Sequence, residues 1–177
     1  MKIVLADVTS ADGFITHGDA PDVTHWSSKE DGEHFLTLRQ KYNLLLMGRK
    51  TYEAVRPKPE AERLRMVLTT QPDSYTASAV PGQLEFTDLS PQKLVASLEV
   101  RGYTSALLLG GGAVNGVFLA AGLGDELYVT IEPLLFGRGT PLLGGVDLNV
   151  SLRLLECKRL NAQGTLLLHY AIMHTAS

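Results

Sequence analysis

The sequence predicts a three-layer α/β fold with a mostly parallel central sheet that ends in an antiparallel hairpin. As far as Glu132, apolar runs of strand length alternate with helix-like stretches. The runs are continuously apolar, which is typical of parallel strands covered on both faces. The tail differs, because two β-like runs, 152–160 and 165–173, flank Asn161-Ala162-Gln163-Gly164, a four-residue loop with the glycine placement of a hairpin.

The helices are placed by their start and stop signals. Ser27 and Glu30 have the spacing of a capping box, with Ser27 as the cap, so a helix is expected from there toward Gln40. Proline is favoured in a first helical turn, so Pro91 starts another helix, which ends at Gly102. The expected strands cover 3–9, 44–47, 65–69, 84–86, 105–109 and 126–132, and two further helices open at Gly48 and cover 113–121.

Composition narrows the class of protein. With 177 residues, of which 45% are hydrophobic, the chain is expected to form one domain over 1–177. The net charge of −3 argues against nucleic-acid partners, and no apolar run reaches the length of a membrane span. The single cysteine, Cys157, excludes an internal disulfide and fits a cytoplasmic location. The five histidines lack the spacing of metal ligands, so no metal is expected.

A triple glycine follows the strand expected at 105–109. Such a turn adopts backbone angles closed to other residues, and it leaves the first N–H groups of the next helix bare for an anion. The alternative is a turn that serves only packing. The residues of this candidate phosphate site are Gly110, Gly111, Gly112, Ala113, Val114 and Asn115.

Two further sites also follow strands. Gly48 precedes Arg49, Lys50 and Thr51, a combination that suits a phosphate, although a basic first turn can also be merely solvated. Thr69 and Thr70 end the next strand. Ligands of open α/β sheets lie beyond the carboxyl ends of the strands, so three such sites favour a dinucleotide. The usual Rossmann fingerprint fits poorly, and basic residues in place of a ribose-binding acid favour NADP over NAD.

Five motifs occur in order along the chain. They are Ser10-x-Asp12-Gly13, Met47-Gly48-Arg49-Lys50-Thr51, Leu68-Thr69-Thr70, Gly110-Gly111-Gly112 and Asp125-Glu126-Leu127…Pro133…Gly137-x-Gly139. Taken together, these motifs resemble the dihydrofolate-reductase-like superfamily, and most closely the reductase domain of the bifunctional riboflavin-biosynthesis deaminase–reductase. The resemblance covers about residues 3–173, and the deaminase domain of that family is absent, so the chain looks like a stand-alone reductase domain.

The resemblance implies an NADPH-dependent reductase that transfers hydride to a small heterocycle or a ribosylamino-pyrimidine. The stretch from Gly48 to Thr51 would hold the adenosine half, Thr69 and Thr70 would flank the ribose phosphate, and 110–115 would hold the pyrophosphate. Val8 and Ile15 would frame the nicotinamide. The implied substrate residues are Ser10, Trp26, Asp31, Thr130 and Glu132. A homodimer is also implied, because related reductase domains are commonly dimers.

The general acid is assigned by comparison with dihydrofolate reductases. Dihydrofolate reductases carry a buried acid on the first helix, and an ungapped count back from Gly48 places Gly32 at that position, which argues against folate reduction. Asp12 is then the expected acid, or else a turn-forming aspartate before a glycine. Asp7, in an apolar strand, is either a buried carboxyl with a raised pKa or the partner of a neighbouring loop. Dihydrofolate or pteridine reduction, and a nucleotide-binding module without turnover, remain the alternatives.

Overall fold

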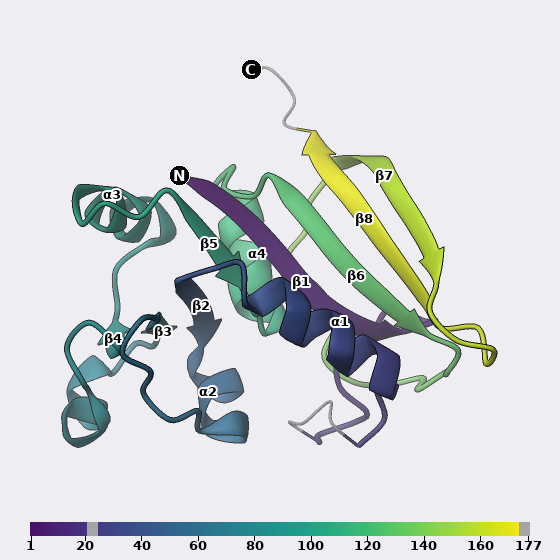
Figure 1. Ribbon diagram of the computed structural model, residues 1–177, viewed down its shortest axis with the longest axis horizontal. Coiled ribbons are helices and arrows are strands. Elements are labelled where there is room, and N and C mark those ends of the chain that lie inside the picture. The colour runs from purple at the N-terminus through teal and green to yellow at the C-terminus, as the bar shows by residue number, and fades with distance from the viewer. Residues whose placement is uncertain (21–24, 174–177) are drawn as a thin grey trace.

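The computed structural model describes residues 1–20 and 25–173, and its centre is one eight-stranded sheet (Figure 1). The spatial order of the strands is β4-β3-β2-β5-β1-β6-β8-β7. The first six are parallel neighbours, and β8 and β7 complete the sheet as an antiparallel pair. The strands are β1 (Lys2–Ser10), β2 (Leu44–Gly48), β3 (Leu64–Leu68), β4 (Leu84–Thr87), β5 (Ser105–Leu108), β6 (Glu126–Glu132), β7 (Ser151–Arg159) and β8 (Leu166–Met173).

Helices cover both faces of the sheet, which confirms the predicted layered fold. Leu38 of α1 and Tyr52 of α2 belong to the apolar core on one face, and Leu94 of α3 and Phe118 of α4 belong to the core on the other. The helices are α1 (Lys29–Arg39), α2 (Arg49–Val55), α3 (Pro91–Val100) and α4 (Gly112–Ala120). None of the helices in the described part of the chain is long and apolar enough to cross a membrane.

Two local features differ from the sequence-based expectation. The cap of α1 is Ser28, one residue later than expected, because its hydroxyl accepts a hydrogen bond from the N–H of Asp31 at 3.3 Å. A 3₁₀ helix over Pro72–Ser78, for which no signal was noted, follows β3. The expected polar loop from Asp19 to His25 falls partly on residues 21–24, which lie outside the described residues.

The carboxyl-terminal hairpin forms the outer edge of the sheet. β8 pairs with β6, and β7 pairs only with β8, with a register shift between Leu154 and Glu156. Every residue of β7 is exposed, including Leu152, Leu154 and Leu155. The hairpin therefore extends the sheet beyond the faces that the helices cover (Figure 1).

Candidate functional site

A cleft of about 1420 Å³ lies over the carboxyl ends of the parallel strands. Its walls come from α1, α2, the first turn of α4 and the loop 139–144, and its floor from the strands between them. The position agrees with the rule that open α/β sheets bind ligands beyond the carboxyl ends of their strands. The cleft therefore brings together segments that are far apart in the sequence.

Most of the residues predicted to bind a cofactor line this cleft, whereas most of the other predicted site residues do not. The lining residues among those predicted are Val8, Ile15, Asp31, Gly48, Arg49, Lys50, Thr51, Thr69, Thr70, Gly111, Gly112, Ala113, Val114 and Thr130. Those outside the lining are Ser10, Asp12, Trp26, Gly110, Asn115 and Glu132. Sequence reasoning also missed His34, Phe35, Arg39 and Tyr128, which line the cleft from α1 and β6.

The triple glycine connects β5 to α4 through a tightly packed turn. Gly111 caps α4 without a side-chain hydrogen bond to the helix. A Cβ atom on Gly112 would lie 2.3 Å from the carbonyl oxygen of Pro141, so glycine lets the loop 141–144 approach the helix. Such a helix start suits an anionic group, because its uncapped N–H groups and the positive end of its dipole face the same cleft.

Gly48 joins β2 to this turn. Its N–H donates a hydrogen bond to the carbonyl oxygen of Gly110 at 2.7 Å, and a Cβ on Gly48 would lie 2.8 Å from Cγ2 of Val114. Both glycine sites predicted from the sequence are therefore parts of one wall. Glycine is needed at 48 because α4 approaches the end of β2 closely there. The residues of this wall fit a phosphate-bearing cofactor.

The basic residues after Gly48 differ in their surroundings. Arg49 forms an ion pair with Glu53, at 2.7 Å between Nη1 and Oε2, and Glu53 also accepts a hydrogen bond from Tyr75. Lys50, the next residue of α2, lines the cleft too. The positive charge of Arg49 is thus partly neutralised within α2, which leaves Lys50 as the stronger electrostatic contact for an anion in this wall.

Asp31 is the buried acid of the cleft. It lies on the inner face of α1 with 8% of its surface exposed, and the hydroxyl of Thr130 on β6 hydrogen-bonds to its carboxyl group. Burial raises the pKa of Asp31 to about 6, against the smaller opposing effect of that hydrogen bond. α1 therefore does present an acid to the cleft, one residue before Gly32, the position that the ungapped count gave.

Asp12 has a different environment. Its carboxylate accepts hydrogen bonds from the hydroxyl of Ser10 at 2.6 Å and from the N–H groups of Phe136 and Gly137 at 3.1 and 2.7 Å. These bonds, that of Ser10 first, lower the pKa of Asp12 to about 2. The side chain joins the loop after β1 to the loop after β6. This favours the turn-forming alternative and speaks against the prediction that Asp12 is the general acid.

Glu132 holds the start of α1 instead of facing the cleft. It is 3% exposed, and its two oxygens accept hydrogen bonds from the N–H of Ser28 and from the hydroxyl of Thr165, both at 2.6 Å. Trp26, also predicted for the substrate, packs edge-on against Phe136 with 5.0 Å between ring centroids. Both side chains therefore shape the site from outside its lining.

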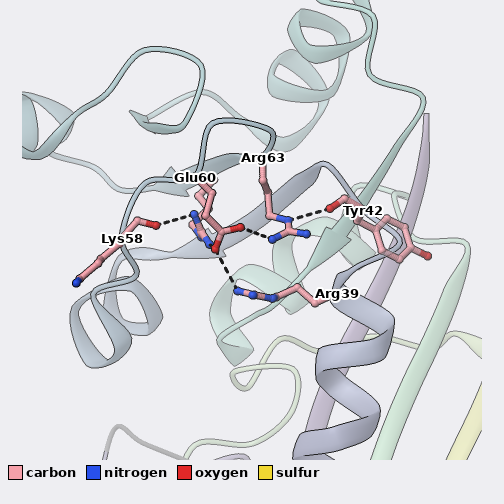
Figure 2. A network of polar contacts seen from close by, with 6 residues as sticks. Arg39, Tyr42, Lys58, Glu60 and Arg63 are labelled. Carbon is pink, nitrogen blue, oxygen red and sulfur yellow. Dashed lines mark hydrogen bonds and ion pairs between the residues drawn. The ribbon is translucent and has the colours of Figure 1, made fainter.

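An arginine network lies beside the cleft, and two of its members, Arg39 and Arg65, line it (Figure 2). Arg65 is 1% exposed and donates hydrogen bonds to the carbonyl of Lys58, at 2.9 Å, and to Glu60. Glu60 also pairs with Arg63 and lies 3.7 Å from Arg39. The one carboxylate thus ties the loop before β3 to β3 itself and to the end of α1.

Asp7, which lines the cleft and is partly buried, pairs with the fully buried Asn115 beside the glycine turn. Nδ2 of Asn115 donates to Oδ2 of Asp7 at 2.9 Å and to the carbonyl of Leu142 at 3.1 Å. A Cβ on Gly110 would lie 3.0 Å from Oδ1 of Asp7, so the carboxyl group contacts the turn directly. Burial raises the pKa of Asp7 to about 7, which is the first of the two roles predicted for this residue.

The fold and the cleft define a dihydrofolate-reductase-like α/β protein, and comparisons with known proteins agree. The chain belongs to the family of the RibD C-terminal domain, whose model matches residues 1–166. The uncharacterised protein YwjB of Bacillus subtilis (strain 168) is 27% identical over 165 residues, which are 89% of this chain and 91% of that protein. The resemblance found in the sequence is thereby confirmed.

Solved structures support the same fold. A pyrimidine reductase-like protein of Corynebacterium diphtheriae has a TM-score of 0.79 at 15% identity, over 98% of this chain and 92% of that one. The deaminase/5-amino-6-(5-phosphoribosylamino)uracil reductase of Thermotoga maritima gives 0.75 at 18%, over 96% and 56%. Dihydrofolate reductase of Enterococcus faecalis, complexed with NADP(H), gives 0.65 at 20%, over 97% and 96%.

Proposed function

We propose that this protein is an NADPH-dependent reductase that transfers hydride to a small planar heterocycle, with a ribosylamino-pyrimidine as the first candidate substrate. The observation that carries the proposal is a single cleft that holds both the glycine wall and the buried acid Asp31. The family of the chain and the printed activity of the Thermotoga maritima relative favour the pyrimidine class.

The cofactor, when bound, supplies the hydride at its nicotinamide ring. Gly111 and Gly112 would hold the pyrophosphate at the start of α4, and Lys50, Thr69 and Thr70 would contact the adenosine end. Val8 and Ile15 would exclude water beside the nicotinamide. These residues supply binding, orientation and a dry environment, which are the contributions that a protein makes to hydride transfer.

Asp31 replaces Asp12 as the proposed general acid. Its carboxyl group lies in the cleft and holds a proton below a pH of about 6. A group with a pKa near the working pH can give up its proton to a substrate atom and regain one from water. The proton held at Asp31 would neutralise the negative charge that hydride addition leaves on the atom bonded to the reduced carbon.

Pteridine or dihydrofolate reduction is the second candidate. The sequence-based argument against it was the absence of an acid on the first helix, and Asp31 removes that argument. The pyrimidine candidate is preferred because the chain belongs to the RibD family.

Binding and turnover test the proposal in turn. NADPH and NADH are titrated by fluorescence, and NADPH oxidation is followed with 5-amino-6-(5-phosphoribosylamino)uracil and with dihydrofolate as acceptors. We expect tighter binding of NADPH and turnover of the pyrimidine. Turnover of dihydrofolate alone would favour the second candidate. Binding without turnover of any acceptor would leave a nucleotide-binding module, and no binding would overturn the proposal.

A homodimer formed along β7 and a cytoplasmic location complete the proposal. β7 lies at the open edge of the sheet and exposes Leu152, Leu154 and Leu155, and an edge strand of this kind can pair with a second copy. The free thiol of Cys157, exposed on the same strand, suits a reducing compartment. Light scattering of the wild type and of Leu154→Lys tests the dimer, because the added charge would separate the copies.

A further inference from the structure

Asp7 is a partly buried carboxyl group in the lining of the cleft that the proposed chemistry does not use. It lies on the face of β1 that packs against α4, next to Val129 of β6 in register. Its side chain touches the two parts of the structure that build the glycine wall, namely Gly110 of the turn and Asn115 of α4. A change in the charge of Asp7 therefore alters the electrostatic potential at the glycine wall, where an anion would bind.

Few charged groups offset a negative charge at this position. The segments β2, β5, α4 and 139–146 contain no titratable residue. β6 contributes Glu126, Tyr128 and Glu132, which alternate with Leu127 and Val129 and so lie on the opposite face of the sheet. Across the cleft, Arg49 and Lys50 lie on α2 and Asp31 on α1. No ion pair of Asp7 occurs among the described residues.

Asn115 shows that the pair has an unused hydrogen-bonding position. Its side chain is fully buried, and both of its described hydrogen bonds use Nδ2, while Oδ1 is without a partner in the described part of the chain. Oδ1 lies 3.5 Å from the Cβ position of Gly110, on the side of the turn. A proton on Asp7 removes the buried charge and adds a donor beside this acceptor.

We propose that Asp7 is a positioning residue that must be protonated for the glycine turn to accept the pyrophosphate of a dinucleotide, so that cofactor binding takes up a proton. The inference rests on the proposed function. An ionised carboxylate beneath the turn repels the bound anion through a poorly solvated interior, where charges interact more strongly than in water. The anion in turn favours the proton on Asp7, because the two equilibria are linked.

The sign of the pH dependence follows from this linkage. In the free protein Asp7 loses its proton at a pH of about 7. Below that pH the carboxyl group of Asp7 is already neutral, so the affinity for the dinucleotide does not change with pH. Above it, a proton must be taken up for each dinucleotide bound, and the dissociation constant rises by up to about tenfold per pH unit.

Calorimetry with NADH as the probe tests the inference, because the pyrophosphate of NADH does not titrate near neutral pH and NADH lacks a 2′-phosphate. Titrations at pH 8 in buffers of different ionisation enthalpy measure the protons taken up. We expect close to one proton for the wild type and for Asp31→Asn, and none for Asp7→Asn. Asp7→Asn keeps a neutral side chain of the same shape, so the affinity of this variant for NADH should be constant from pH 6 to 9.

Each outcome of the calorimetry supports or overturns the inference about Asp7. Binding of NADH with no proton uptake and with a flat pH profile in the wild type overturns the inference and leaves the proposed cofactor site standing. Uptake that persists in Asp7→Asn overturns it too. Failure of NADH and NADPH to bind at any pH overturns the proposed function and the inference with it. If Asp7→Asn does not fold, a wild type that takes up no proton still overturns the inference, and uptake that disappears in Asp31→Asn overturns it as well.

Discussion

Glu132 and Ser28, which lie on different elements, are joined by a hydrogen bond of 2.6 Å from the N–H of Ser28 to the carboxylate of Glu132. Ser28 is also the residue that caps α1. A buried carboxylate thus lies at the positive end of the helix dipole, where negative charge is stabilising. The start of α1 is fixed against β6, and the position of Asp31, three residues further on, depends on this contact.

Replacement of Glu132 by glutamine should loosen α1. We expect Glu132→Gln to lower the free energy of unfolding by about 1–2 kcal/mol, because a hydrogen bond assisted by charge becomes a neutral one. Denaturant unfolding measures the change. Glu156→Gln, on the exposed strand β7, is the matched control and should have little effect. Equal losses of unfolding free energy in the two variants would show that the hydrogen bond between Glu132 and Ser28 does not stabilise the protein.

Asp31→Asn should separate chemistry from cofactor binding. If Asp31 donates the proton, the loss of the acid lowers kcat by about 10²–10⁴-fold and leaves NADPH affinity nearly unchanged. In the wild type, kcat should fall as the pH rises through about 6, because only the protonated form donates. This dependence should vanish in the variant.

Asp12→Asn provides the comparison for that experiment. It should keep the fall of kcat near pH 6, because its carboxylate holds the N–H groups of the loop after β6 and does not face the cleft. A pH profile that changes in Asp12→Asn and not in Asp31→Asn would restore the assignment made from the sequence.

The same chemical change should have opposite effects at two glycines. Gly112→Ala places a Cβ 2.3 Å from the carbonyl oxygen of Pro141, so we expect a loss of about 1–3 kcal/mol and weaker cofactor binding. Gly32→Ala, within α1, meets no atom within 4 Å and should stabilise the protein by about 0.5–1 kcal/mol through helix propensity. Thermal unfolding compares the two, and a neutral Gly112→Ala would contradict the close packing of this turn.

Loss of Glu60 should leave Arg65 without its charged partner. Arg65 is almost fully buried although Glu60 is partly exposed, so we expect Glu60→Ala to destabilise the protein by about 1–3 kcal/mol, because the guanidinium loses its charged partner. Glu62→Ala, two residues along and exposed, serves as the control. If the two variants unfold at the same denaturant concentration, the network in Figure 2 does not stabilise the loop before β3.

Stability itself should depend on pH through Asp7 and Asp31. Both have a pKa raised by burial, from an ordinary value of 3.8 to about 7 and about 6. Their contribution to stability is fully present below pH 4 and is lost as the pH rises through the folded-state pKa values, by up to about 1.4 kcal/mol per pH unit for each group. Asp7→Asn should therefore unfold at a higher temperature than the wild type at pH 8 and not at pH 4.

The fold could be predicted well because its signals are local. Buried parallel strands are continuously apolar, and glycines mark their ends, so the strands were placed within about two residues at each end, the expected scatter of such boundaries. The glycine sites were found for the same reason. The cap at Ser28 was missed because two adjacent serines offer the same hydroxyl, and only the backbone geometry selects one of them.

The acids of the site could not be assigned from sequence because their roles depend on contacts between distant segments. Asp12 is fixed by N–H groups about 125 residues away, and Glu132 by Ser28, which is 104 residues distant. Asp31 lies one residue before Gly32, the position that the ungapped count gave for a helix acid. On a helix, one residue turns a side chain by about 100°, which decides whether an acid faces the cleft.

The order of strands has a consequence for how the chain can fold. β1 precedes the other strands in sequence and lies inside the sheet, where Lys2 is beside Ser105 and Val4 is beside Glu126. On the ribosome, β1 therefore has no strand partner until β5, which begins at Ser105, has been synthesised. Pairings so distant in sequence fold slowly, and the apolar run 3–5 is a natural binding segment for a chaperone during that wait.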